Sequence, residues 1–176
     1  MLSVYELLSN GRIDEAKSFI SKNNRIISDS ETYVKTDSMI ANAVINSKLT
    51  TAAALGVKVS CITVSDFKGI DEVDLCELLG NMLENAVTAC KEMPADSQRF
   101  IYLEIGREND NYSFLVKNAL ERSVLDSNPE LKTSKNDETE HGLGVSIIKE
   151  IALKYNGRYD FYETDNAFCC SVILEV

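Results

Sequence analysis

The sequence predicts an α+β fold, a two-layer sandwich in which helices cover one face of a β-sheet. Helical and strand-like segments follow one another in the order helix, strand, helix, two strands, long loop, helix, two strands. Short turns join the strands in pairs, and the chain lacks a series of repeated βαβ units. We therefore expect hairpins in the sheet, with the helices gathered on one side.

The N-terminal part is expected to be helical. Residues 2–10 and 13–23 predict two short helices that break at Asn10-Gly11, a pair that commonly ends a helix. Residues 1–35 would then form a helical hairpin arm, and residues 36–176 the main domain. A third helix should begin with a cap at Thr36 or Asp37 and run to Gly56. Its expected face is Ile40, Ala43, Val44, Ser47, Leu49 or Lys48, and Ala52.

Period-two alternation predicts the strands. Residues 57–66 form the first, with Val57, Val59, Cys61 and Thr63 on one side. Residues 99–110 and 111–119 form a hairpin around an Asn-Asp-Asn turn, and residues 158–165 and 167–176 form a second around Asp165-Asn166. Residues 119–140 lack periodicity and predict a mobile lid, which precedes a helix that ends near Gly157.

Charge and cysteine usage narrow the class of protein. The formal net charge of −10 argues against a nucleic-acid partner, because phosphate binding uses clustered cations. The five cysteines form no CxxC pair and lie in apolar stretches, as is typical of reduced, buried thiols in a cytosolic protein. Neither a membrane-spanning run nor a signal peptide is present, so we expect a cytoplasmic chain.

The helix expected at residues 74–90 combines a core stripe with an unusual polar face. Asn81 and Asn85 are i,i+4 neighbours, and with Glu84 they place two amides and a carboxylate on one side. Such a face is either an ordinary solvated surface or a site for a small ligand or ion, and the helix alone leaves both open. The apolar positions that repeat at three- and four-residue steps are Leu75, Leu79, Met82, Leu83, Ala86 and Cys90.

A second informative stretch begins the last helix. Gly142 and Gly144 precede an amphipathic segment directly after the expected lid. Free N–H groups at the positive end of a helix form an anion site, although a lone GxG is equally the mark of a helix start that lets backbone pass closely. A nucleotide cleft is favoured by the order in which four elements follow one another along the chain. These are the Asn/Glu helix, the hairpin that ends at Asn118, the lid and the GxG.

Two motifs resemble those of the GHKL ATPases, the superfamily of gyrase, the heat-shock chaperones, the mismatch-repair ATPases and the histidine kinases. LLGNMLENAVTAC (78–90) resembles the N-box, and HGLGVSIIKEIALKYNG (141–157) resembles the second glycine box. LLSNGRIDEAKSFI (7–20) and TSK (133–135) are most similar to membrane sensor histidine kinases of the peptide-sensing, accessory-gene-regulator type. The resemblance covers nearly the whole chain and implies a Bergerat ATP-binding fold with a mixed sheet.

The resemblance implies roles for the helix at 74–90. Asn85 matches the asparagine that coordinates Mg²⁺, and Asn81 matches a side chain that approaches the phosphates or metal-bound water. Glu84 matches a frequent acid whose role is either catalytic or a local salt bridge. Lys135 matches a mobile lid cation that reaches the γ-phosphate of ATP. The residues implied to bind nucleotide at the lid and glycine box are Thr133, Ser134, Lys135, His141, Gly142, Leu143 and Gly144.

Two departures from the family pattern affect these assignments. The first glycine box, Asp-x-Gly-x-Gly, is missing, and Asn118 stands where its Asp accepts the adenine amino group. An Asn carbonyl is also an acceptor, so adenine recognition through Asn118 is possible. The only histidine is His141 in the glycine box, which we interpret as a lid-hinge or phosphate-proximal residue and not as a phosphorylation site.

The leading functional hypothesis is the ATP-binding catalytic domain of a sensor histidine kinase. With ATP and Mg²⁺ as cofactors, it would transfer phosphoryl to a histidine on a dimerisation helix outside this fragment. Its parent would be an anchored, homodimeric membrane kinase that signals to a response regulator. The alternatives are a catalytically silent scaffold that binds nucleotide or a partner, and another GHKL ATPase or protein kinase.

Overall fold

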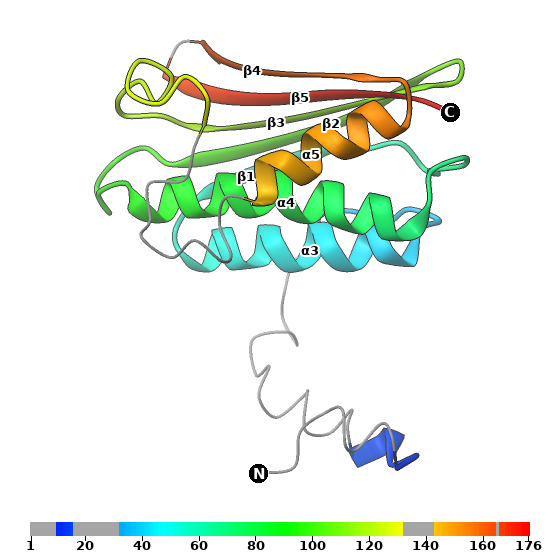
Figure 1. The fold of residues 1–176 in the computed structure, drawn as a ribbon. Coiled ribbons are helices and arrows are strands. Elements are labelled where there is room, and N and C mark those ends of the chain that lie inside the picture. The colour runs from blue at the N-terminus through cyan, green and yellow to red at the C-terminus, as the bar shows by residue number, and fades with distance from the viewer. Residues whose placement is uncertain (1–9, 16–31, 132–142, 165) are drawn as a thin grey trace. The chain divides into compact units, whose positions relative to one another are not determined.

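The structure is a computed structural model that describes residues 10–15, 32–131, 143–164 and 166–176 (Figure 1). The chain divides into two compact units, Met1–Glu31 and Thr32–Val176. In the first unit, Asn10 and Gly11 form a turn with Gly11 at φ 69°, and residues 13–15 are helical. This agrees with the predicted break at Asn10-Gly11. The other residues of the predicted arm lie outside the described ranges.

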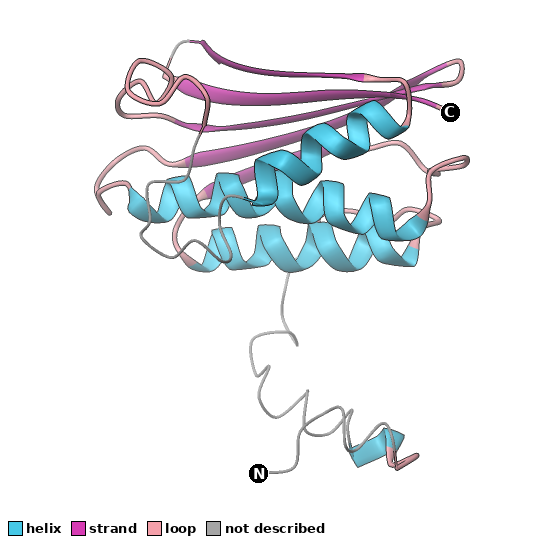
Figure 2. Cartoon of the chain, viewed as in Figure 1, coloured by secondary structure: helices cyan, strands magenta, loops and turns pink. Residues whose placement is uncertain are grey.

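The second unit is an α+β sandwich, as predicted. The helices of its described residues lie on one face of a five-stranded sheet (Figure 2). No helix in the described residues combines the length and the apolar character needed to cross a bilayer. The elements are α3 (Met39–Ala54), β1 (Lys58–Ile62), α4 (Glu72–Glu92), β2 (Phe100–Glu108), β3 (Asn111–Ala119), α5 (Leu143–Lys154), β4 (Arg158–Thr164) and β5 (Ala167–Glu175).

The sheet is mixed, with strand order β1-β2-β3-β5-β4. Strands β2 and β3, and strands β4 and β5, form the two predicted hairpins, and β3 also pairs antiparallel with β5. Strand β1 runs parallel to β2, with Val59 opposite Ile101. This parallel pair makes the sheet mixed, as the family resemblance implied, and it arises because α4 carries the chain back along the sheet between the two strands.

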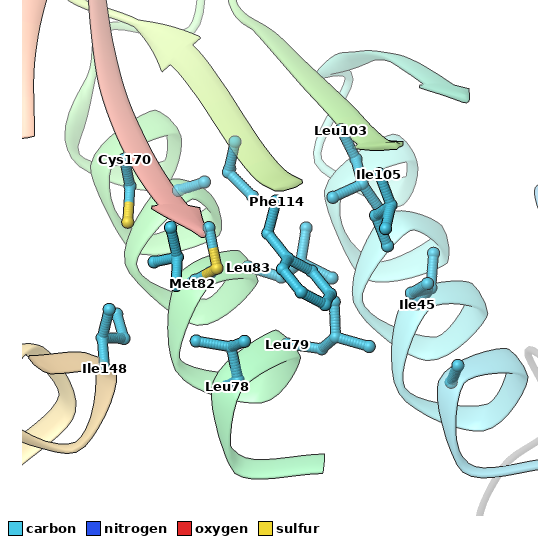
Figure 3. Close-up of a cluster of buried hydrophobic side chains, with 14 of the residues drawn as sticks. Ile45, Leu78, Leu79, Met82, Leu83, Leu103, Ile105, Phe114, Ile148 and Cys170 are labelled. Carbon is cyan, nitrogen blue, oxygen red and sulfur yellow. The ribbon is translucent and has the colours of Figure 1, made fainter. Parts of the chain in front are cut away.

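The core lies between the helices and the sheet (Figure 3). Helix α4 is its centre, because every apolar position predicted for its stripe is at most 1% exposed. Phe114 of β3 and Cys170 of β5 meet this helix from the sheet side. All five cysteines are free thiols, and burial raises the pKa of Cys170 to about 12. Cys90, Cys169 and Cys170 are buried, as expected, whereas Cys61 and Cys76 are only partly buried.

The buried face of α3 differs from the one predicted. Its fully buried residues are Ala41, Ile45, Leu49 and Ala52, so only Leu49 and Ala52 of the predicted face are correct. The helix is apolar and alanine-rich on several sides, so its periodicity defines no single stripe. The cap was also misplaced by a residue or two, since the Ser38 side chain accepts from the N–H of Ala41.

The segment before α3 belongs to the second unit. Asn46 Oδ1 accepts from the N–H groups of Tyr33 and Val34 at 2.8 and 3.1 Å, and Asn42 Oδ1 accepts from Thr36 N–H at 2.8 Å. These amides tie residues 33–36 to α3. The unit thus begins at Thr32, a few residues before the predicted boundary at 35/36.

Candidate functional site

The start of α5 lies against the polar face of α4. A Cβ atom at Gly144 would be 3.0 Å from Asn81 Oδ1 and 3.6 Å from Asn85 Oδ1. Glycine at residue 144 therefore permits a close approach of the α5 backbone to both amides. The N-box and glycine-box segments, more than fifty residues apart in the sequence, meet at this point.

The two asparagines present oxygen atoms to the same small region. Asn81 Nδ2 donates to the Glu77 carbonyl at 2.7 Å, which turns Asn81 Oδ1 away from its own helix backbone. Asn85 is solvent-exposed and Asn81 is half-buried. Both are hard oxygen donors of the kind that Mg²⁺ accepts.

A magnesium site here would have few protein ligands. Within the described residues, no cluster of three or more His, Cys, Asp or Glu side chains could hold a metal ion. Mg²⁺ is commonly bound by one or two protein groups together with substrate phosphates and water. The amide oxygens of Asn81 and Asn85 fit that type of site, whereas a metal cage made only of protein groups does not fit.

An ion-pair network fixes the angle of α5 on α4. Lys154 Nζ contacts both oxygens of Asp74 at 2.9 and 2.6 Å, and the Tyr155 hydroxyl donates to Asp74 Oδ2 at 2.6 Å. Burial raises the pKa of Asp74, but the hydrogen bonds from Lys154 and Tyr155 outweigh it and hold that pKa below its ordinary value. These residues were not singled out in the sequence, because no motif marks a partnership between side chains so distant along the chain.

Asn118 lies at the end of β3, on the face of the sheet that the helices cover. It is 4% exposed and shares that face with Phe114 and Val116. Its Nδ2 donates to the Ala119 carbonyl at 3.0 Å. Within the described residues its Oδ1 makes no hydrogen bond, so the amide offers an acceptor toward the helix layer.

Glu84 points to a different neighbour from the two asparagines. Its Oε2 is 2.5 Å from Lys48 Nζ of α3, and both side chains are partly exposed. The ion pair places the carboxylate on the α3 side of α4, beside a cleft between these helices. Of the two roles expected for Glu84, catalysis or a local salt bridge, the salt bridge has a specific partner in Lys48.

The first part of the predicted lid is anchored to the sheet. Glu163 Oε1 of β4 accepts from the N–H groups of Val124 and Leu125 at 2.7 and 3.0 Å, and Leu120 N–H donates to Asn166 O at 2.7 Å. Residues 120–131 form turns and bends with no helix or strand, as expected for a loop, and these hydrogen bonds hold the start of that loop. The remaining lid and glycine-box candidates lie outside the described residues: Thr133, Ser134, Lys135, His141 and Gly142.

Comparison with solved structures identifies the same architecture in histidine kinases. The catalytic domain of the histidine kinase ThkA superposes with a TM-score of 0.58 at 16% identity, over 77% of this chain and 89% of that one. The Acinetobacter baumannii histidine kinase AdeS superposes with a TM-score of 0.60 at 10% identity, over 99% of this chain and 86% of that one. Full-length ShkA in complex with AMPPNP gives 0.57 at 14% identity, over 98% of this chain and 39% of that one.

Comparison with family models gives the family directly. A search of curated proteins finds no match. The model of the GHKL domain matches residues 70–175, which include α4, α5 and every strand except β1. The matched region holds Asn81, Asn85, Asn118 and Gly144. The chain belongs to the GHKL-domain family, and its fold is that of histidine kinase catalytic domains.

Proposed function

We propose that this chain is the ATP-binding catalytic domain of a sensor histidine kinase and transfers the γ-phosphate of ATP to a histidine outside residues 1–176. The observation that carries the proposal is the approach of Gly144 to Asn81 and Asn85. It brings the start of a helix, where N–H groups lack helical partners, next to two amide oxygens. That combination suits a phosphate chain bound together with a cation.

Each group has a distinct task in this proposal. The amides at the start of α5 bind phosphate oxygens, and Asn85, assisted by Asn81, holds Mg²⁺. When bound, Mg²⁺ neutralises phosphate charge. Asn118 Oδ1 accepts from the amino group of adenine, and Lys135 of the lid approaches the γ-phosphate. The domain contributes position and charge neutralisation, which account for most of the catalysis in phosphoryl transfer.

The finer assignment rests on the sequence resemblance. The segments 7–20 and 133–135 favour a peptide-sensing kinase of the accessory-gene-regulator type, with residues 1–35 as part of the dimerisation arm. In that arrangement the parent is a membrane-anchored homodimer, and its phosphohistidine supplies a response regulator.

Calorimetry with a non-hydrolysable ATP analogue tests the proposal. We expect the wild-type chain to bind the analogue more tightly with Mg²⁺ than without it. Asn85→Ala should remove the magnesium dependence and leave the melting temperature unchanged, because Asn85 is exposed. Asn111→Ala, at an exposed asparagine where β3 begins, is the matched control. Equal magnesium dependence in both variants would contradict the metal assignment.

One observation favours a catalytically silent scaffold as the second candidate. The Glu84 carboxylate is paired with Lys48, so it is engaged away from the asparagines. Mixing the chain with a separately prepared dimerisation domain that carries the acceptor histidine distinguishes the two. Nucleotide binding without label on that histidine would support the scaffold.

A further inference from the structure

The open face of the sheet carries a groove rich in positive charge. Residues of β1, β2 and β3 line it together with residues of the loops before β1 and β2. The helices α3, α4 and α5 cover the opposite face of the sheet (Figure 2). Its volume is about 820 Å³. We call it the cationic groove, and the residues that matter for its chemistry are Lys58, Ser60, Arg99, Phe100, Tyr102 and Lys117.

Strand pairing explains why these side chains share one face. Val59 and Cys61 pack against the core, so Lys58 and Ser60 point to the open side of β1. Ser60 pairs with Tyr102 of β2, and Tyr102 pairs with Lys117 of β3, which places them in one row across the sheet. Adjacent strands are about 4.8 Å apart, so the row spans about 10 Å.

The positive charge of the groove is not neutralised by the protein. Within the described residues, Lys58, Arg99 and Lys117 take part in no ion pair, and no acidic side chain lines the groove. Glu104, two residues after Tyr102 on β2, accepts a hydrogen bond from the Tyr102 hydroxyl at 2.6 Å. Three unpaired cations are notable in a chain with a net charge of −10.

The cations are held in place by other groups. Arg99 Nη2 donates to the Leu55 carbonyl at 2.7 Å, while Arg99 Nε is buried and has no hydrogen-bond partner within the described residues. Lys117 Nζ lies 5.8 Å from the centre of the Tyr102 ring. A buried donor without an acceptor is costly, and like charges gathered on one face repel one another. An anionic occupant of the groove relieves the repulsion between these cations.

We propose that the cationic groove binds an acidic, extended peptide segment of a partner protein. Lys58 stands on β1 and Lys117 on β3, with β2 between them, and Arg99 lies in the loop just before β2, so Lys58 and Lys117 stand two strands apart across the groove. Alternate side chains of an extended peptide lie about 7 Å apart, which matches separated carboxylates to separated cations. Phe100 and Tyr102 lie between the cations and accept the apolar part of such a peptide.

The groove is separate from the proposed nucleotide site, because Asn81, Asn85 and Gly144 lie in the helix layer on the other side of the sheet. Binding of the acidic peptide and binding of nucleotide can therefore be lost independently.

Fluorescence anisotropy with a labelled peptide tests the proposal. The probe alternates glutamate with leucine and tyrosine, and its control replaces each glutamate with glutamine. We expect binding of the glutamate peptide to the whole chain, strongly weakened by salt as for other contacts between exposed charges. The double variant Lys58→Glu/Lys117→Glu should lose about tenfold or more in affinity, because attraction becomes repulsion at two contacts.

A matched double variant controls for net charge. Lys35→Glu/Lys68→Glu changes the same number of charges at exposed lysines outside the groove, and it should retain peptide binding. Both variants should bind the ATP analogue like the wild type. Three results would overturn the proposal. The two double variants would lose peptide affinity equally, or the glutamine peptide would bind as well as the glutamate peptide. In the third, the chain would bind only anionic lipid vesicles or inorganic phosphate.

Discussion

Gly144 is the position at which a single methyl group tests the phosphate site most directly. In Gly144→Ala, the new Cβ would lie 3.0 Å from Asn81 Oδ1, closer than ordinary van der Waals contact. Asn81 is held by its hydrogen bond to the Glu77 carbonyl, so it must rotate out of that bond or the start of α5 must move away. Either response disturbs the proposed phosphate and metal groups together.

The effect on folding should be small and the effect on binding large. Alanine is favoured over glycine in a helix by up to about 1 kcal/mol, and loss of the Asn81–Glu77 hydrogen bond costs about as much, so the free energy of unfolding should change by no more than about 1 kcal/mol. Loss of one hydrogen bond to a charged phosphate costs about 1.5–3 kcal/mol, or about 10- to 140-fold in Kd. Gly144→Val should lose more.

Calorimetry with the ATP analogue and thermal unfolding without nucleotide measure the two effects. Gly80→Ala is the matched control, because Gly80 lies in α4 and a Cβ there meets nothing within 4 Å. It should bind nucleotide normally and gain slightly in stability. Retained nucleotide affinity in Gly144→Ala would refute the reasoning, and would mean that the glycine serves only the packing of α5 on α4.

Three further predictions concern stability and chemistry. Lys154→Met should lower the free energy of unfolding by about 1 kcal/mol at neutral pH; since the pKa of Asp74 is lowered in the folded state, this difference should vanish as acid titration passes below that pKa. Gly157→Ala should cost about 3 kcal/mol or more by denaturant titration, because a Cβ would lie 1.8 Å from the Ile173 carbonyl oxygen; a smaller loss would show that β5 shifts easily. Incubated alone with labelled ATP, the chain should form no acid-labile phosphohistidine, and label on His141 would contradict an acceptor outside residues 1–176.

Sequence periodicity was enough to predict an element correctly where a single pattern dominated the segment. The stripe of α4 and the two hairpins follow from spacing and turn residues that admit few alternatives. The face of α3 was predicted wrongly because alanine and apolar residues surround that helix. The parallel pairing of β1 with β2 depends on where α4 packs, which is a tertiary property and leaves no local signal.

In the candidate site too, local motifs were predictable from the sequence and contacts between distant segments were not. Asn81, Asn85 and Gly144 were found from motifs, and the structure brings them together. Their support by Lys154 and Asp74 could not be read from the sequence, because two charges eighty residues apart become partners only when α5 crosses α4. Anchoring of the lid start by Glu163 is likewise a contact between distant segments.

In the proposed nucleotide site, Asn118 stands in place of the Asp of the missing first glycine box. At 4% exposure a carboxylate would carry a desolvation cost that a neutral amide avoids. Nδ2 donates one of its two hydrogens to the Ala119 carbonyl, and Oδ1 is the atom that we propose accepts from the ligand. An adenine amino group donates to such an oxygen, whereas the carbonyl oxygen of guanine at the same place is another acceptor. We therefore expect fluorescent ATP to bind more tightly than fluorescent GTP. Asn118→Asp should keep that order and Asn118→Leu should abolish it; equal affinity of the wild-type chain for both nucleotides would remove Asn118 from the adenine pocket.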